Sequence, residues 1–222
     1  MREIVLDTET TGLDPRSGDR IVEIGCFEVI NHVATGENYH CYINPQRDMP
    51  EAAYAVHKLS EEFLRGHPVF ADVIDDFLAF IGESPLVIHN AEFDMKFINA
   101  ELDRLDRPII PMSQSIDTLA MARRKFPGAA ASLDALCRRF NINLADRTQH
   151  GALLDARLLA EVYMELSGGR QPDLGLATAA SEHSNAPVTR IARPPRPHAP
   201  TATELAAHEA FVETLPDAVW KR

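Results

Sequence analysis

Hydrophobic and polar residues follow a strand-like pattern along the first part of the chain. An apolar run at 4–6 ends in acidic residues, and β-branched residues are frequent in 20–30, which a turn at Asn31-His32 separates from 33–43. Such runs, separated by turn residues, are typical of antiparallel strands. The sequence therefore predicts a ribbon of three antiparallel strands.

Further along the chain, apolar residues recur at the three- and four-residue spacing of amphipathic helices. The ranges with this spacing or with a helix-start signal are 60–62, 70–81, 93–105, 119–125, 132–140 and 153–166. Short segments at 86–89 and 115–117 predict two more strands. Strands first, then strands alternating with helices, are typical of a mixed α/β sheet flanked by helices, in which we expect the first strand to be central.

The composition changes after the last of these helices. Residues 170–200 are expected to form a semi-extended linker, because they contain prolines at 187, 194, 195, 197 and 200. The final segment, 201–222, begins with a capping-box pair, Thr201 and Glu204, and predicts a helix with an apolar stripe. This helix either docks on a partner or folds back onto the domain that we expect at 1–169.

The charge of the chain is unevenly distributed. The whole net charge of −11 comes from residues 1–169, because the remaining tail holds six basic and six acidic residues. An acidic body is poorly suited to gripping a long phosphate backbone by counterion release. If the chain acts on nucleic acid, it must therefore hold a short end through bound metals or borrow a basic partner.

The cysteines are few, and their positions show no metal-binding spacing: Cys26, Cys41 and Cys137. A sparse, odd-numbered set indicates a reducing compartment and no disulfide framework. The sequence also shows no signal-peptide region and no apolar run long enough to span a membrane. We therefore expect a cytoplasmic protein.

Asp7 and Glu9 stand at the end of the first apolar run. Side chains two positions apart on a strand share a face, so these carboxylates would lie side by side. At a buried strand end they would repel each other unless a cation or a proton compensates. Oxygen ligands of this kind suit Mg²⁺ or Mn²⁺. The alternative is an acidic strand end that faces water.

Three more motifs place polar residues near predicted element boundaries. Asp94 falls in the first turn of a helix, where the helix dipole favours a carboxylate even without a ligand. Gly151 allows His150 to lie in a loop before the helix that carries Asp155, so His150 is either a general base or an ordinary surface residue. His57 either forms a lip on the substrate side or is a solvated loop residue.

Together, the ordered motifs resemble a known family. They are Asp-Thr-Glu-Thr-Thr-Gly at 7–12, His-Asn-Ala-Glu-Phe-Asp at 89–94, Asp-Thr-Leu-Ala-Met-Ala-Arg at 117–123, Ser-Leu-Asp-Ala-Leu-Cys at 132–137 and His-Gly-Ala-Leu-Leu-Asp-Ala at 150–156. They are similar to the DEDDh 3′–5′ exonucleases of the ribonuclease H-like superfamily, and within it to the proofreading branch, the epsilon subunits of bacterial DNA polymerase III. The resemblance covers residues 1–170 and implies a mixed five-stranded sheet flanked by helices, with a flexible C-terminal tail.

The resemblance implies a role for each residue of the site. Four acidic residues would hold two divalent metal ions, Mg²⁺ or Mn²⁺: Asp7, Glu9, Asp94 and Asp155. Asp7 would bridge both ions. Glu9 and Asp155 would bind the ion that carries the attacking water, and Asp94 would hold the other. His150 would be the general base.

The same resemblance implies a set of substrate-binding residues: Asp7, Glu9, Thr10, His57 and Asp155. Within this set, Thr10 and His57 would hold the terminal nucleotide. Lys58 departs from the family pattern, which has glycine there, and adds a positive charge near the nucleotide.

Two segments of the tail resemble docking peptides. Residues 171–176, Gln-Pro-Asp-Leu-Gly-Leu, resemble the short motif by which replication proteins bind a sliding clamp, although plain linker is the alternative. Residues 201–222, with Trp220 close to the end, resemble the segment with which epsilon subunits bind the polymerase catalytic subunit alpha. Both partners would supply the grip on DNA that the acidic body lacks.

The resemblance thus implies a 3′–5′ exonuclease that proofreads DNA replication by two-metal hydrolysis of mispaired 3′-terminal nucleotides. Its substrate would be a single-stranded or frayed DNA 3′ end. One alternative is an RNA-trimming exonuclease of the same superfamily, but the clamp-like hexapeptide favours a replication protein. The other is a non-catalytic adaptor between polymerase and clamp, which would need neither the four acidic residues nor His150.

Overall fold

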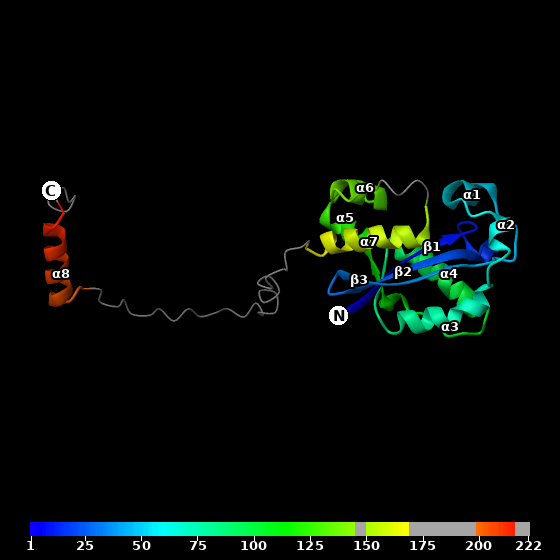
Figure 1. The fold of residues 1–222 in the computed structure, drawn as a ribbon, viewed down its shortest axis with the longest axis horizontal. Helices are drawn as coiled ribbons and strands as arrows, with labels where there is room; N and C mark the ends of the chain where they lie inside the picture. The colour runs from blue at the N-terminus through cyan, green and yellow to red at the C-terminus, as the bar shows by residue number, and fades with distance from the viewer. Residues whose placement is uncertain (145–149, 169–198, 216–222) are drawn as a thin grey trace, which may run out of the picture. The chain divides into compact units, whose positions relative to one another are not determined.

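The computed structural model describes residues 1–144, 150–168 and 199–215. The chain divides into two compact units, Met1–Asp173 and Leu174–Arg222. Figure 1 shows the elements of both units.

The first unit is built on a five-stranded mixed sheet with the strand order β3-β2-β1-β4-β5. Its strands are β1 (Arg2–Thr10), β2 (Ile21–Ile30), β3 (Val33–Tyr42), β4 (Leu86–Ile88) and β5 (Ser115–Asp117). The first three strands pair antiparallel, whereas β4 is parallel to β1 and β5 is parallel to β4. The predicted ribbon, the central place of β1 and the mixed sheet are all confirmed.

Seven α-helices and two short 3₁₀ turns complete the described part of this unit. They are η1 (Pro15–Ser17), α1 (Glu51–His57), α2 (Glu61–Leu64), α3 (Phe70–Ile81), α4 (Ala91–Asp103), η2 (Met112–Gln114), α5 (Thr118–Lys125), α6 (Leu133–Arg139) and α7 (Ala152–Leu166). The sequence predicted all the helices except α1. That helix has no apolar stripe to detect, because only its last residue, His57, is buried.

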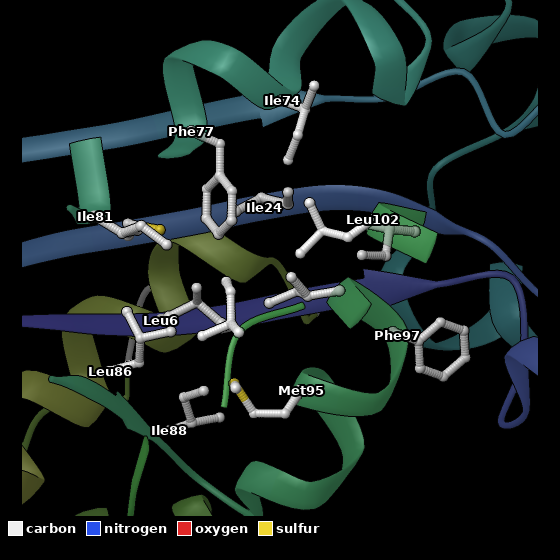
Figure 2. Packing of buried hydrophobic residues seen from close by; sticks show 14 of the residues in the cluster. Leu6, Ile24, Ile74, Phe77, Ile81, Leu86, Ile88, Met95, Phe97 and Leu102 are labelled. Carbon is white, nitrogen blue, oxygen red and sulfur yellow. The ribbon is translucent and has the colours of Figure 1, made fainter. Parts of the chain in front are cut away.

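Two hydrophobic cores cover the two faces of the sheet. Because strand side chains alternate, Ile4 and Leu6 of β1 face α3 and α4, whereas Val5 faces α5, α6 and α7 (Figure 1). Figure 2 shows Phe77 of α3 and Met95 of α4 among the side chains of the first core, close to Leu6 and Ile88 of the sheet. Each fully buried side chain of this kind contributes about 1.5–3 kcal/mol to folding.

Gly25 of β2 allows α7 to approach the sheet closely. It pairs with Asp7 across the two strands, and a Cβ at this position would lie 2.3 Å from the backbone carbon of Ala152. No side chain fits in that space, so only glycine lets the first turn of α7 rest on the strand. The position of this turn decides where Asp155 lies.

The second unit contains one described helix, α8 (Ala202–Glu213). The predicted capping box is confirmed: Thr201 Oγ1 accepts a hydrogen bond from the Glu204 amide, and the Glu204 carboxylate accepts one from the Thr201 amide, at 3.3 and 2.8 Å. Leu205 and Phe211 on this helix are exposed. The clamp-like hexapeptide at 171–176, the prolines up to residue 197 and Trp220 lie outside the described residues.

None of the helices in the described ranges has the length and the apolar character that crossing a lipid bilayer requires.

Candidate active site

Asp7 and Glu9 lie at the carboxyl end of the central strand, on the face that packs against α7. Val5 on the same face belongs to the core of α5, α6 and α7, and the strand alternation carries this face on to Asp7 and Glu9. Glu9 is buried and Asp7 is half-buried. The two carboxylates therefore share one side of the strand end, as the sequence predicted.

Asp94 reaches the same strand from the other face of the sheet. It lies in the first turn of α4, which follows β4 after only His89 and Asn90, and Asn90 has left-handed backbone angles of φ 69° and ψ 56°. Oδ1 of Asp94 accepts hydrogen bonds from the backbone amide and the hydroxyl of Thr8, at 3.0 and 2.7 Å. These bonds fix the carboxylate of α4 beside the residue that separates Asp7 from Glu9.

Asp155 and His150 come from the start of α7. Asp155 is buried in the first turn, and His150 precedes the helix, so that its Nδ1 lies 3.1 Å from Oδ2 of Asp155. Ligand atoms of Glu9, His150 and Asp155 all lie within 4.8 Å of one another. The structure therefore brings together residues that are more than 140 positions apart in the sequence.

The electrostatics of this cluster are those of crowded, poorly solvated carboxylates. Burial raises the pKa of Asp7 well above its usual value, and the charges of Asp94, Glu9, Asp155 and Glu23 raise it further. Burial also raises the pKa of Asp94, to about 7, against the opposing effect of the hydrogen bonds from Thr8. A divalent cation would remove this repulsion, and the hard oxygen donors present are those that Mg²⁺ and Mn²⁺ take.

Two cavities open beside the carboxylates. One, of about 600 Å³, is lined by residues that include Glu9, Thr10, Leu13, Ala53, His57 and Phe93. The other, of about 570 Å³, is lined by residues that include Asp7, His89, Arg123, Ser132, His150 and Asp155. The two cavities share no lining residue, and each contains part of the carboxylate cluster.

His57 is buried, so the prediction of a solvated loop residue, one of the two alternatives from the sequence, is wrong. It is the last residue of α1 and only 2% exposed, and its Nδ1 accepts a hydrogen bond of 3.0 Å from the amide of Leu59. Burial lowers its pKa, although the negative charge of Glu23 works in the other direction. A neutral ring at the wall of the first cavity results.

Lys58 shows how the chain does without the glycine of the family pattern. It caps α1 with left-handed backbone angles of φ 61° and ψ 14°, a conformation that glycine adopts most readily. Its Nζ lies 5.5 Å from the centre of the Tyr54 ring, over its face. The turn that glycine would form is therefore present, and the lysine charge lies against an aromatic ring.

Three further residues of the site were not predicted. Glu23 of β2, 3% exposed, pairs with Glu9 across the strands and accepts a hydrogen bond of 2.7 Å from Nε2 of His40, in which the histidine nitrogen carries the proton. The carbonyl of Val56 accepts a 3.4 Å hydrogen bond from the His150 amide, so α1 helps to place the histidine. The third is Gly25. An acid within the apolar run 21–26 was the available signal for Glu23.

Comparison with known proteins places this arrangement in a family. Residues 4–163 match the family model described as Exonuclease. The DNA polymerase III subunit epsilon of Rickettsia felis is 50% identical over 222 residues, which are 97% of each chain. The subunit of the same name from Escherichia coli is 44% identical over 228 residues, covering 96% of this chain and 93% of that one. The chain belongs to this exonuclease family.

Solved structures agree with the assignment. Exonuclease X in complex with 5′ overhanging duplex DNA is 27% identical, with a TM-score of 0.57, over 74% of this chain and 90% of that one. The nuclease domain of 3′hExo, a DEDDh family member bound to rAMP, is 16% identical, with a TM-score of 0.64, and shares the fold over 77% of this chain and 94% of that one. The predicted exonuclease of the epsilon branch and its ribonuclease H-like fold are confirmed.

Proposed function

We propose that this exonuclease proofreads DNA synthesis, removing mispaired nucleotides from a DNA 3′ end as a subunit of the replicative polymerase. The observation that carries the proposal is the convergence of four acidic residues and His150 at the end of β1. The names of its relatives, DNA polymerase III subunit epsilon, supply the replicative context.

The four acidic residues would hold two divalent ions. The charges of Asp94, Glu9 and Asp155 all raise the pKa of Asp7, so Asp7 would be shared by both ions. Glu9 and Asp155 would hold one ion, and Asp94 would hold the other. When bound, such ions stabilise the charge that develops on the phosphate and on the departing 3′ oxygen. The raised pKa values of Asp7 and Asp94 support this use, because burial disfavours the charged form of both carboxylates and a bound cation would favour it.

His150 would accept the proton of the attacking water. With Nδ1 protonated and donating to Oδ2 of Asp155, its Nε2 carries the lone pair that a general base uses. The side chain is 48% exposed, so the proton can leave to solvent. The buried Asp155 thus both faces the metal site and orients the base.

The terminal nucleotide would occupy the cavity lined by Thr10 and His57. This cavity adjoins Glu9 and is walled by α1 and by Phe93 of α4, which offers a ring for the base. A mispaired end costs less to unstack and to feed into such a pocket than a paired end does. Selectivity for mismatches would therefore arise largely before the chemical step.

The tail would connect the enzyme to its partners. We propose that 201–222, whose described part forms α8 with exposed Leu205 and Phe211, binds the polymerase catalytic subunit alpha. The hexapeptide at 171–176 would bind the sliding clamp, and 170–200 would be the linker. Such an assembly belongs in the cytoplasm and would supply the basic surface that the acidic domain at 1–169 lacks.

The test is release of nucleotides from primers with a paired or a mispaired 3′ end, in Mg²⁺ and in Mn²⁺. We expect faster release from the mispaired end, and no release by an Asp7→Ala, Glu9→Ala double variant. Full activity of the double variant would refute the proposal. Faster trimming of an RNA strand than of single-stranded DNA would favour the RNA-processing alternative, and co-purification of the full chain, but not of a 1–170 truncation, with the polymerase subunit would support the role of the tail.

A further inference from the structure

The second cavity is lined by Asp7, His150 and Asp155, yet it lies apart from the cavity assigned to the terminal nucleotide. If the proposed function holds, the bond that is cut lies at the carboxylates, and the terminal nucleotide fills the cavity of Thr10 and His57. The rest of the strand must then continue from the scissile phosphate through the other cavity. The lining of that cavity therefore meets the next phosphate of the strand.

Arg123 lines this second cavity and offers a positive charge to such a phosphate. It projects from α5 and is exposed, and it forms no ion pair or hydrogen bond with any residue in the described ranges. A guanidinium without a partner among the described residues suits phosphate in an acidic domain, because its planar donors match phosphate oxygens. Arginines that serve the fold of this unit have partners, as the bond of Arg20 to Glu101 shows.

Two other titratable groups of the cavity, Asp134 and His89, have contacts of their own. Asp134 lies 3.9 Å from Nη2 of Arg138, on the next turn of its own helix. His89 is half-buried with its Nδ1 2.9 Å from Oγ1 of Thr118, and burial keeps its pKa low. Among the described residues that line the cavity, Arg123 is therefore the arginine that faces the strand.

We propose that Arg123 binds the phosphate next to the scissile one, on the side of the strand that remains after cleavage. The residue would make the enzyme prefer a polynucleotide end to a mononucleotide ester. It is a binding residue, because it lies outside the group of side chains that contact the reacting atoms.

The experiment measures single-turnover release of the first 3′ nucleotide from two single-stranded DNA oligonucleotides. One is unmodified, and the other carries an uncharged methylphosphonate at the second linkage from the 3′ end. We expect Arg123→Ala to lower kcat/KM on the unmodified strand about tenfold, the effect of about 1.4 kcal/mol of binding energy, and to have little effect on the methylphosphonate strand. Arg123→Lys should retain part of the preference.

Arg124→Ala is the matched control, because it removes the same charge from the neighbouring position of α5 and Arg124 does not line the cavity. We expect this variant to have the same ratio of kcat/KM between the two strands as the wild type. The value of log(kcat/KM) should fall with log[salt] for every variant. Because Arg123→Ala loses one phosphate contact, this fall should be less steep by about 0.7 in that variant and unchanged in Arg124→Ala.

Equal losses for Arg123→Ala on the two strands would overturn the inference, and so would equal losses for the two alanine variants on the unmodified strand. A wild-type protein that releases no nucleotide from either strand would instead refute the proposed function itself. These results are distinguishable because the first two require an active wild-type enzyme.

Discussion

The two ends of β1 both carry buried acidic residues, on the same face of the strand and under the same helix, but they are treated differently. At the amino end, Glu3 accepts a 2.8 Å hydrogen bond from the Tyr163 hydroxyl of α7 and lies 3.2 Å from Nδ1 of His32. At the carboxyl end, the charges that act most strongly on Asp7 are all negative. The tyrosine of α7 thus donates to the first carboxylate, whereas like charges act on Asp7 in the second group, where a bound cation would relieve the repulsion.

This difference separates a structural acid from a functional one. A buried carboxylate with donors around it fixes the position of a helix, and here it holds the distal part of α7 to the sheet. A buried cluster of mutually repelling carboxylates costs stability, and a bound cation would restore it. The following experiments test that separation.

The largest effect is expected for removal of the charge of Asp7. Asp7→Asn should lower exonuclease activity by about 10³–10⁵-fold, because the shared position in the metal site would be lost. Without metal the same variant should be more stable than the wild type, since a repelled charge is gone. Thermal unfolding in a chelator and a primer-degradation assay measure the two effects.

Glu3→Gln is the control for Asp7→Asn, because it neutralises an acid on the same face of the same strand. It should leave catalysis nearly unchanged and lower stability instead, by weakening the hydrogen bond from the Tyr163 hydroxyl. Loss of activity in a folded Glu3→Gln protein would abolish the distinction between the two ends.

Removal of the base should be the next largest effect. His150→Ala should slow hydrolysis by about 10²–10⁴-fold, the usual contribution of a general base. Binding of Mn²⁺ should change little, because the carboxylates of Asp7, Glu9, Asp94 and Asp155 remain. Calorimetric titration with Mn²⁺ checks the second point, and a variant that no longer binds the ion would contradict the assignment of His150 as base.

Gly25→Ala should disturb the site without touching any of its polar groups. The added Cβ would push the first turn of α7 away from β2, moving Asp155 and His150 relative to Asp7. We expect a loss of about 1–3 kcal/mol in stability and a fall in kcat larger than the change in KM. A variant with normal stability and normal kcat would show that the contact is not required.

Removing the metal should reveal a pH dependence of stability. The pKa of Asp94 is about 7 in the folded protein, above its ordinary value of 3.8, so the folded state binds the proton more tightly than the unfolded state does. In a chelator, the free energy of unfolding should therefore fall as the pH rises from about 4 to about 7. In Asp94→Asn, the free energy of unfolding should fall less with pH. In the wild type, Mg²⁺ or Mn²⁺ should oppose the fall. The same pH dependence in Asp94→Asn and in the wild type would contradict the raised pKa of Asp94.

Much of the fold could be predicted from local patterns. The apolar run of β1, the β-branched residues of β2 and the helical spacing in 70–81 involve several residues each, so single exceptions do not obscure them. The helix α1 was missed because its seven residues bury only His57, which leaves no periodic signal. Because α1 was not predicted, the burial of His57 at its end was not predicted either, and one alternative placed His57 in solvent.

The candidate site divides in the same way. The sequence by itself determined that Asp7 and Glu9 share a strand face, that Asp94 begins a helix and that His150 precedes one, because these are consequences of local geometry. Only the tertiary structure decided that Thr8 holds Asp94, that Gly25 admits α7, and that Glu23 and Arg123 lie beside the site. Contacts between distant segments depend on how whole elements pack, and packing is set by the shapes of both cores together rather than by any one stretch of residues.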